Sequence, residues 1–141
     1  MTSDSSSAPL ACATASASTQ SLAELRILRF DEERSHIALR GALDVSGTRR
    51  VEMLFTSIVT ARRLPAIIEL QHLTFLSSYA MCMLIMASRA IRLRGRLLVL
   101  VAPQPEIEKV LRATRLHQLI PVAATVAEAE ALIAAHPVTT A

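Results

Sequence analysis

Residues 96–101 constrain the fold more than any other segment of the sequence. After Arg96 come five consecutive apolar residues, Leu-Leu-Val-Leu-Val. A strand with one solvent-exposed face would instead alternate apolar and polar residues. A continuously apolar strand is typical of a sheet buried on both faces, and sheets of that kind are mostly parallel and connected through helices. The segment therefore indicates an α/β fold in which residues 96–101 form a strand buried on both faces.

Strand and helix patterns alternate before this segment. Residues 25–30 and 36–39 can each alternate sides, and the charged turn 31–34 between them predicts an antiparallel hairpin. Ser46 is the expected N-cap of a first helix, and a short apolar strand is expected at 66–70. The apolar residues of the first helix recur at spacings of three and four: Val51, Leu54, Phe55, Ile58 and Val59.

Three more helices are expected further along. Residues 80–93 are mostly apolar and rich in Ala and Met, which favours a helix that Gly95 closes. Pro105 opens the next helix, residues 119–121 form a short last strand, and residues 125–128 match a capping box that opens the final helix. The apolar residues of these last two helices are Ile107, Val110 and Leu111, and then Ala129, Leu132 and Ile133. The predicted fold class is α/β: a mixed sheet of four to five strands with about four helices, opening with a β-hairpin.

Length and composition are those of one domain with an aliphatic core. The chain has 141 residues, of which 52% are hydrophobic and only 3% aromatic. Residues 22–136 are expected to form the domain. Residues 1–21, rich in Ser, Ala and Thr, are expected to be a disordered tail, and residues 137–141 a loose C-terminus.

The charge distribution argues against nucleic-acid binding. The net charge of +3 is spread over scattered arginines, and one Tyr with three Phe leaves little for base stacking. Arg89, Arg92, Arg94 and Arg96 form one cluster, which is typical of the solvated end of a helix, where cations suit the dipole. Docking of an acidic partner is the second interpretation of this cluster.

No cofactor, metal or enzymatic site is expected. Cys12 and Cys82 have no second Cys or His at metal-ligand spacing, and three isolated glycines make no phosphate loop. Ser77 or Ser78 with His72 mimics a Ser–His pair, yet no Gly-x-Ser-x-Gly motif accompanies it. We therefore expect that the protein is not an enzyme.

A cytoplasmic location is expected. The most apolar run, residues 80–87, is about half the ~20 residues that a bilayer span requires. The N-terminus lacks the basic region and the continuous apolar region of a signal peptide. Neither membrane insertion nor secretion is therefore expected.

Three stretches carry a resemblance to a known family. Residues 41–44 read Gly-Ala-Leu-Asp, and residues 69–81 read Glu-Leu-Gln-His-Leu-Thr-Phe-Leu-Ser-Ser-Tyr-Ala-Met. They resemble two motifs of the STAS family (sulphate transporter and anti-sigma factor antagonist): Gly-x-Leu-Asp, and Asp-Leu-Ser-x-Val-x-Phe-Ile-Asp-Ser-(Ser or Ala)-Gly-Leu. A long helix ending near Gly95 and a Leu-Leu-Val-Leu strand also fall where the family has them, so the resemblance covers roughly residues 25–135.

The resemblance implies an anti-sigma factor antagonist. In such members the serine after the signature aspartate is phosphorylated by the anti-sigma factor, which is itself a kinase, whereas the unphosphorylated form binds that kinase and frees the sigma factor. Aligned through Phe75 and Leu76, this acceptor falls on Ser78, at the start of a helix. A helix N-terminus favours a phosphate through its unpaired N–H groups and its field. The implied function is sequestration of the kinase by a non-catalytic module, which serine phosphorylation switches off.

The signature departs from the family pattern at three positions. Ser77 stands for the signature Asp, Ala80 for the Gly, and Glu69 for the strand-end Asp. Loss of the acid removes a contact to a kinase's metal or basic groups, and Ala restricts how closely a partner backbone can approach. The departures at Ser77 and Ala80 favour an alternative: a constitutive STAS subunit of a transporter or stressosome-like assembly without a phosphoswitch.

The expected partner surface combines a loop at 72–77 with the first turns of the following helix. The turn 41–47 is expected beside it, because both segments precede helices at the same strand ends. One serine of the pair is expected to cap the helix, and Met83 and Met86 to contact the partner. The partner is expected to be an anti-sigma factor with serine kinase activity, and the chain to be a monomer or weak dimer. The surface residues are His72, Thr74, Ser77, Ser78, Tyr79, Met81, Cys82, Met83, Asp44 and Ser46.

Overall fold

The computed structural model describes residues 22–62 and 64–136. Strands β2 (Glu24–Phe30) and β3 (Ser35–Leu43) pair antiparallel, which confirms the predicted hairpin. The tail predicted at 1–21 and the loose end predicted at 137–141 lie outside the described residues.

Helix α2 (Val45–Phe55) starts directly after β3. Asp44, and not Ser46, is its N-cap, because the Asp44 side chain accepts a hydrogen bond from Gly47 N at 2.6 Å. The prediction for Ser46 is therefore wrong, and this residue lies exposed in the first turn.

A π-helical turn, Thr56–Thr60, continues α2. Val51, Phe55, Ile58 and Val59 are buried as predicted. Leu54 is 46% exposed, because it lies at the edge of the apolar stripe rather than at its centre.

Strands β4 (Ala66–Glu69) and β6 (Leu98–Val101) form the centre of the sheet and pair in parallel. The strand order is β2-β3-β4-β6-β7, where β7 is the two-residue strand Val122–Ala123. All four residues of β6 are buried, with alternate side chains in different cores: Leu98 and Leu100 join the larger one, Val99 and Val101 the smaller. This confirms the two-face burial that the sequence predicts.

One strand is missing from the sequence prediction. Residues Leu73–Leu76, expected as part of a loop, form β5 and pair in parallel with the end of β3. Leu73 and Leu76 are buried whereas Thr74 and Phe75 are exposed, so this four-residue segment has no two-residue alternation. Its strand conformation comes from β3, whose register shifts next to Gly41, at a φ of 80°.

Helix α3 (Ser78–Arg92) follows β5 and confirms the predicted long helix. It buries Ala80, Leu84, Ala87 and Ile91 against the sheet. Gly95, at a φ of 74°, ends the turn that leads into β6.

The last third of the chain contains α4 (Pro105–Ala113), β7 (Val122–Ala123) and α5 (Val126–Ala135). The predicted strand at 119–121 is wrong in its bounds, because β7 begins three residues later and ends two residues later. Pro121 has no N–H to donate, so only its carbonyl reaches the ladder, accepting from Leu100 N at 2.9 Å.

The predicted capping box opens α5 in a modified form. The Thr125 side chain accepts from Glu128 N at 3.1 Å, whereas the Glu128 carboxylate accepts from Ala124 N, one residue before the cap. Ala129 is buried, and Ile133 packs against the smaller core.

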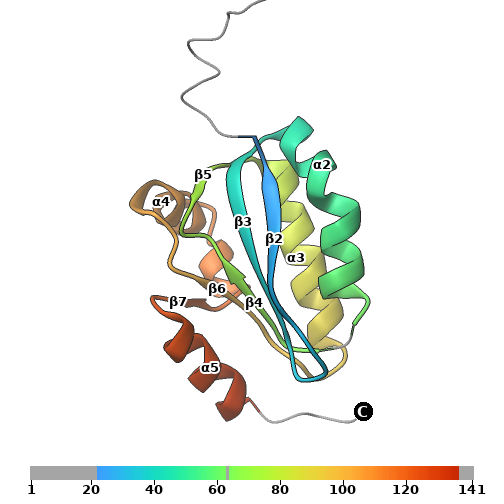
Figure 1. The fold of residues 1–141 in the computed structure, drawn as a ribbon. Helices are drawn as coiled ribbons and strands as arrows, with labels where there is room; N and C mark the ends of the chain where they lie inside the picture. The colour runs from blue at the N-terminus through green and yellow to red at the C-terminus, as the bar shows by residue number, and fades with distance from the viewer. Residues whose placement is uncertain (1–21, 63, 137–141) are drawn as a thin grey trace, which may run out of the picture.

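The helices cover the two faces of the sheet unequally. Residues from α2, α3 and α4 share the larger core with the sheet, whereas α5 contributes the helical part of the smaller core, over β6 and β7. Figure 1 shows α2 and α3 side by side, with α5 across the sheet from them. Within residues 22–62 and 64–136, no helix packs on the side of β2 and β3 that faces away from α2 and α3.

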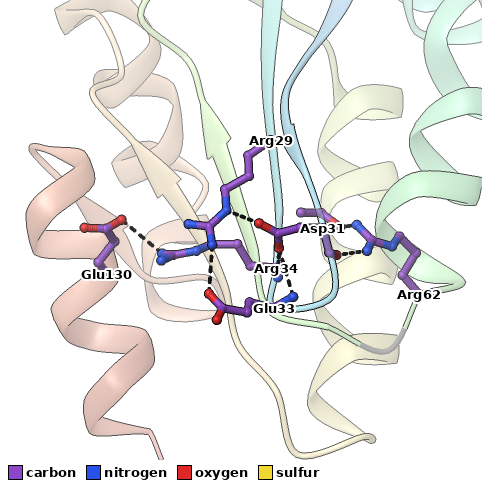
Figure 2. A network of polar contacts seen from close by, with 7 residues as sticks. Arg29, Asp31, Glu33, Arg34, Arg62 and Glu130 are labelled. Atoms are coloured by element: carbon purple, nitrogen blue, oxygen red, sulfur yellow. Dashed lines mark hydrogen bonds and ion pairs between the residues drawn. The ribbon is translucent and has the colours of Figure 1, made fainter.

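The hairpin turn lies at the opposite end of β3 from α2 and is tied to two other segments. The Arg62 guanidinium stacks on the Phe30 ring at 3.9 Å, donates to Ser35 Oγ at 2.8 Å and also donates to the Asp31 carbonyl. Figure 2 shows Arg62 reaching the turn from the segment after α2. These contacts join the hairpin to the connection before β4.

The Asp31 carboxylate organises the same turn. It accepts hydrogen bonds from Glu33 N at 2.9 Å and Arg34 N at 3.1 Å, and it pairs with Arg29. Arg34 in turn forms an ion pair with Glu130 of α5 at 3.2 Å. The Arg29 side chain, followed by the backbone amides, lowers the pKa of Asp31 to about 2.

We predict that Asp31 contributes to the acid sensitivity of the fold. Because its folded pKa is depressed, its stabilisation is present above the unfolded pKa of about 4 and is lost as the pH falls towards 2. Asp31→Asn should lower Tm at pH 6 and flatten the fall of Tm between pH 5 and 2, measured by circular dichroism. Glu32→Gln, an exposed acid of the same turn, is the control; equal curves for both variants would contradict the prediction.

Candidate functional site

Two strand ends and two helix starts meet at one edge of the sheet. Leu43 of β3 lies opposite Leu76 of β5, and Ser77 N donates to the Leu43 carbonyl at 2.9 Å. Asp44 follows the first strand and Ser77 the second, so the N-termini of α2 and α3 lie side by side. The turn 41–47 is therefore adjacent to the serine pair, as predicted.

The two serines have different roles in the local structure. Ser77 is the N-cap of α3: its backbone is extended and its side chain accepts from Ala80 N at 3.2 Å. Ser78 is the first helical residue and is exposed. In the part of the chain that the structure describes, no hydrogen bond involves the Ser78 hydroxyl, which leaves it accessible.

The first turn of α2 is packed tightly beneath this edge. A Cβ on Gly47 would lie 2.2 Å from the Ala42 carbonyl oxygen and 2.8 Å from Ala23 Cβ. Gly47 is therefore required for the close approach of α2 to β3, and Asp44 fixes the same turn by capping it. The close packing at Gly47 and the cap by Asp44 together place the exposed residues Val45 and Ser46 at the rim of the site.

Tyr79 links the first turn of α3 to the middle of α2. Its hydroxyl donates to Glu52 Oε1 at 2.7 Å. This hydrogen bond to a carboxylate, together with partial burial, raises the pKa of Tyr79 above its ordinary value, against the smaller opposing effect of Arg49. The tyrosine lies beside an open groove of about 680 Å³ between the helices, lined by Arg49, Glu52, Met53, Thr56, Ser57 and Tyr79.

The methionine-rich part of α3 is divided between core and surface. Met81 is half-buried, and Cys82 is exposed as a free thiol. Met83 is only 7% exposed, so the prediction that it contacts a partner is wrong; it faces the core on the side of α3 next to Leu84 and Ala87. Met86, in contrast, is 70% exposed.

His72 and Thr74 are exposed but face a different hollow. They line a space of about 340 Å³ together with Gly41 and Gln104 and with residues of β2 and β3, whereas neither serine lines it. His72 also accepts from Gly41 N through its carbonyl at 3.0 Å. The residues predicted for the partner surface thus lie on two adjoining parts of the molecule.

Ala80 does not restrict access to the site. Its side chain is 0% exposed and packs in the larger core. The methyl group that replaces the signature glycine hydrogen points inward, so the expected limit on a partner's approach is wrong. The change at Ser77 is of another kind, because serine keeps the capping oxygen but lacks the negative charge of an aspartate.

Two α2 residues of this surface, Arg49 and Met53, were absent from the sequence prediction. Arg49 and Met53 are exposed, on the side of α2 away from Val51 and Phe55. Their exposure is predicted by their positions in the helical repeat, off the apolar stripe that contains Val51 and Phe55. Their position beside Tyr79 follows from the packing of α2 on α3, which no local motif encodes.

The described residues contain no group of three His, Cys, Asp or Glu side chains placed to hold a metal ion. Over residues 22–62 and 64–136, no helix has the length and apolarity needed to cross a membrane.

We predict that the two serines differ in their effect on stability. Ser77→Ala removes the cap of α3 and should cost about 1 kcal/mol, within the usual range of about 0.5–2 kcal/mol. Ser78→Ala removes an exposed hydroxyl and should change the free energy of unfolding by less than about 0.5 kcal/mol. Urea unfolding followed by circular dichroism measures both, and a larger loss for Ser78→Ala would refute the assignment of the cap.

We predict that Glu52→Gln lowers the pKa of Tyr79, because the variant removes the carboxylate that stabilises the protonated phenol. The chain has one Tyr and no Trp, so ultraviolet absorbance reports this phenol alone. Glu106→Gln, on the exposed side of α4, is the control. Identical titrations for Glu52→Gln and wild type would rule out the Tyr79–Glu52 contact.

Comparison with solved structures identifies relatives of the fold. An anti-sigma factor antagonist from Mycobacterium paratuberculosis aligns with a TM-score of 0.67 at 19% identity, over 79% of this chain and 95% of that chain. The antagonist SpoIIAA in its unphosphorylated form gives 0.63 at 19%, over 80% and 96%. The phosphorylated form of the Bacillus protein SpoIIAA gives 0.59 at 19%, over 78% and 99%.

Comparison of the sequence with curated proteins and with family models gives different results. No curated protein matches the chain. The model of the STAS domain matches residues 27–129, from the first strand of the hairpin into α5, and so covers well over half of the chain. The alternating elements, the capped strand ends and this match agree, and the chain belongs to the STAS domain family.

Proposed function

We propose that the protein is a cytoplasmic anti-sigma factor antagonist. In this proposal it is a non-catalytic module that sequesters an anti-sigma factor with serine kinase activity, and phosphorylation of Ser78 switches it off. The observation that carries the proposal is the division between the serines: Ser77 caps α3, while the exposed Ser78 hydroxyl stays available. We expect the protein to act as a monomer or weak dimer.

The surroundings of Ser78 suit a phosphate. The first turn of α3 contains no acidic residue, so the positive end of the helix is not neutralised within that turn. A phosphoserine at the first helical position adds about −1.5 to −2 charges without removing the Ser77 cap. SpoIIAA, which has the same fold, occurs in a phosphorylated and an unphosphorylated form.

Phosphorylation would weaken partner binding because the charged phosphate loses its contact with water in the complex. The partner surface combines the first turns of α2 and α3, and the exposed Ser78 lies in the first turn of α3. A partner bound to this surface would bury a phosphate at that position. An unpaired buried charge costs several kcal/mol, so phosphorylation weakens the complex.

The test is phosphorylation by the cognate anti-sigma factor with ATP, followed by mass spectrometry of the peptide that contains residues 77–81. Wild type and Ser77→Ala should each gain one phosphate on Ser78, whereas Ser78→Ala should gain none. Phosphorylated wild type should bind the kinase at least about 100-fold more weakly than unmodified protein, as calorimetry can measure. An unmodified peptide would refute the switch.

A second candidate function is a constitutive subunit of a transporter or stressosome-like assembly. Ser77 favours it, because this residue supplies no acid next to the acceptor. Affinity capture separates the two candidates. A kinase of the ATPase fold as the dominant partner supports the switch, and a transporter nucleotide-binding subunit supports the alternative.

A further inference from the structure

The exposed face of α3 continues well beyond Ser78. Exposed residues recur every three or four positions along it, and such positions share one helical face. Two of them are apolar and protrude: Met86 is 70% exposed and Leu93, directly after the helix, is 82% exposed. The full set is Ser78, Cys82, Met86, Arg89 and Leu93.

A groove of about 320 Å³ runs beside the second half of this face. It lies between α3 and the segment around the 3₁₀ turn Leu116–Gln118, and we call it the α3–3₁₀ groove. Ile85 and Ile120 provide apolar walls, and Leu119, 54% exposed, protrudes at the edge. The polar lining consists of Ser88, Arg89, Arg92 and Gln118.

The charge of the groove is of one sign. No Asp or Glu occurs in the sequence between Glu69 and Glu106, which includes all of α3. Within the described ranges Arg89 and Arg92 form no ion pair, whereas Arg112 of the neighbouring helix is neutralised by Glu108 at 3.0 Å. Two free guanidinium groups beside apolar walls match a ligand that carries a carboxylate next to an apolar group.

We propose that the α3–3₁₀ groove is a second part of the partner-binding surface. It receives a segment of the anti-sigma factor that presents an acidic side chain next to an apolar one, so the inference rests on the proposed function. Apolar contact with Ile85 and Leu119 supplies burial, and the arginines bind the carboxylate. The occupant is a protein segment, because the groove is continuous with the exposed face that begins at Ser78.

The size of a stable interface supports this extension. Specific complexes bury about 800 Å² on each partner, contributed by about 20–30 residues. The two helix starts offer fewer residues than this. Arg89 lies eleven positions after Ser78, or about 16 Å along the helix at the usual rise per residue, so one partner can cover both.

The same distance makes the two parts of the interface independent. At physiological salt, charges are screened over about 8 Å, so a phosphate on Ser78 does not neutralise Arg89. Changes at sites this far apart are additive. The groove therefore supplies affinity and specificity in both states, while Ser78 alone carries the switch.

The test is charge reversal in the groove. Arg89→Glu with Arg92→Glu should weaken binding of the kinase that phosphorylates Ser78 by about 10- to 100-fold at about 0.15 M salt. The matched control, Arg94→Glu with Arg96→Glu, makes the same charge change in the same cluster outside the groove and should alter Kd by less than about threefold. Circular dichroism verifies folding, and Arg89→Gln with Arg92→Gln replaces the first variant if it does not fold.

The outcomes separate the two proposals. Selective loss of binding in the groove variant supports the inference. Equal binding by wild type and both variants overturns it but leaves the antagonist function intact, and equal weakening by both variants also overturns it, because net charge then explains the effect. Failure of wild type to bind the kinase overturns both proposals.

Discussion

Hydrogen bonding along β3 is the constraint on which the rest of the structure depends. The first half of this strand pairs with β4 and the second half with β5, so β3 joins the buried centre of the sheet to the edge that carries the candidate site. The bond from Ser77 N to the Leu43 carbonyl then aligns the two strand ends. Because each helix is capped by the residue that directly follows its strand, this alignment also determines where α2 and α3 begin.

Elements with a local pattern could be predicted from the sequence. The apolar run of β6, the charged turn of the hairpin and Pro105 at the start of α4 each identify an element without reference to the rest of the chain. β5 could not be predicted in this way, because its conformation depends on pairing with β3. The N-cap at Asp44 was missed for a related reason: it depends on how far β3 extends, and strand ends are weakly marked in sequence.

The candidate site, like the fold, could be predicted from the sequence only in part. The serine pair follows from the resemblance to the family motif, and the adjacent turn follows from the order of strands and helices. The contribution of Arg49 and Glu52 depends on how two helices pack, which the sequence does not display. Met83 was misassigned because methionines occupy several faces of α3, and only the packing on the sheet decides which of them is buried.

The separate roles of Ser77 and Ser78 have a consequence for the lifetime of the protein in the cell. Proteases act on the opened chain, so a modification that removed a helix cap would also accelerate degradation. Here the residue that holds the helix end and the residue with the free hydroxyl are neighbours but different. Because phosphorylation at position 78, as proposed, leaves the Ser77 cap of α3 in place, switching the protein off would not expose it to faster degradation.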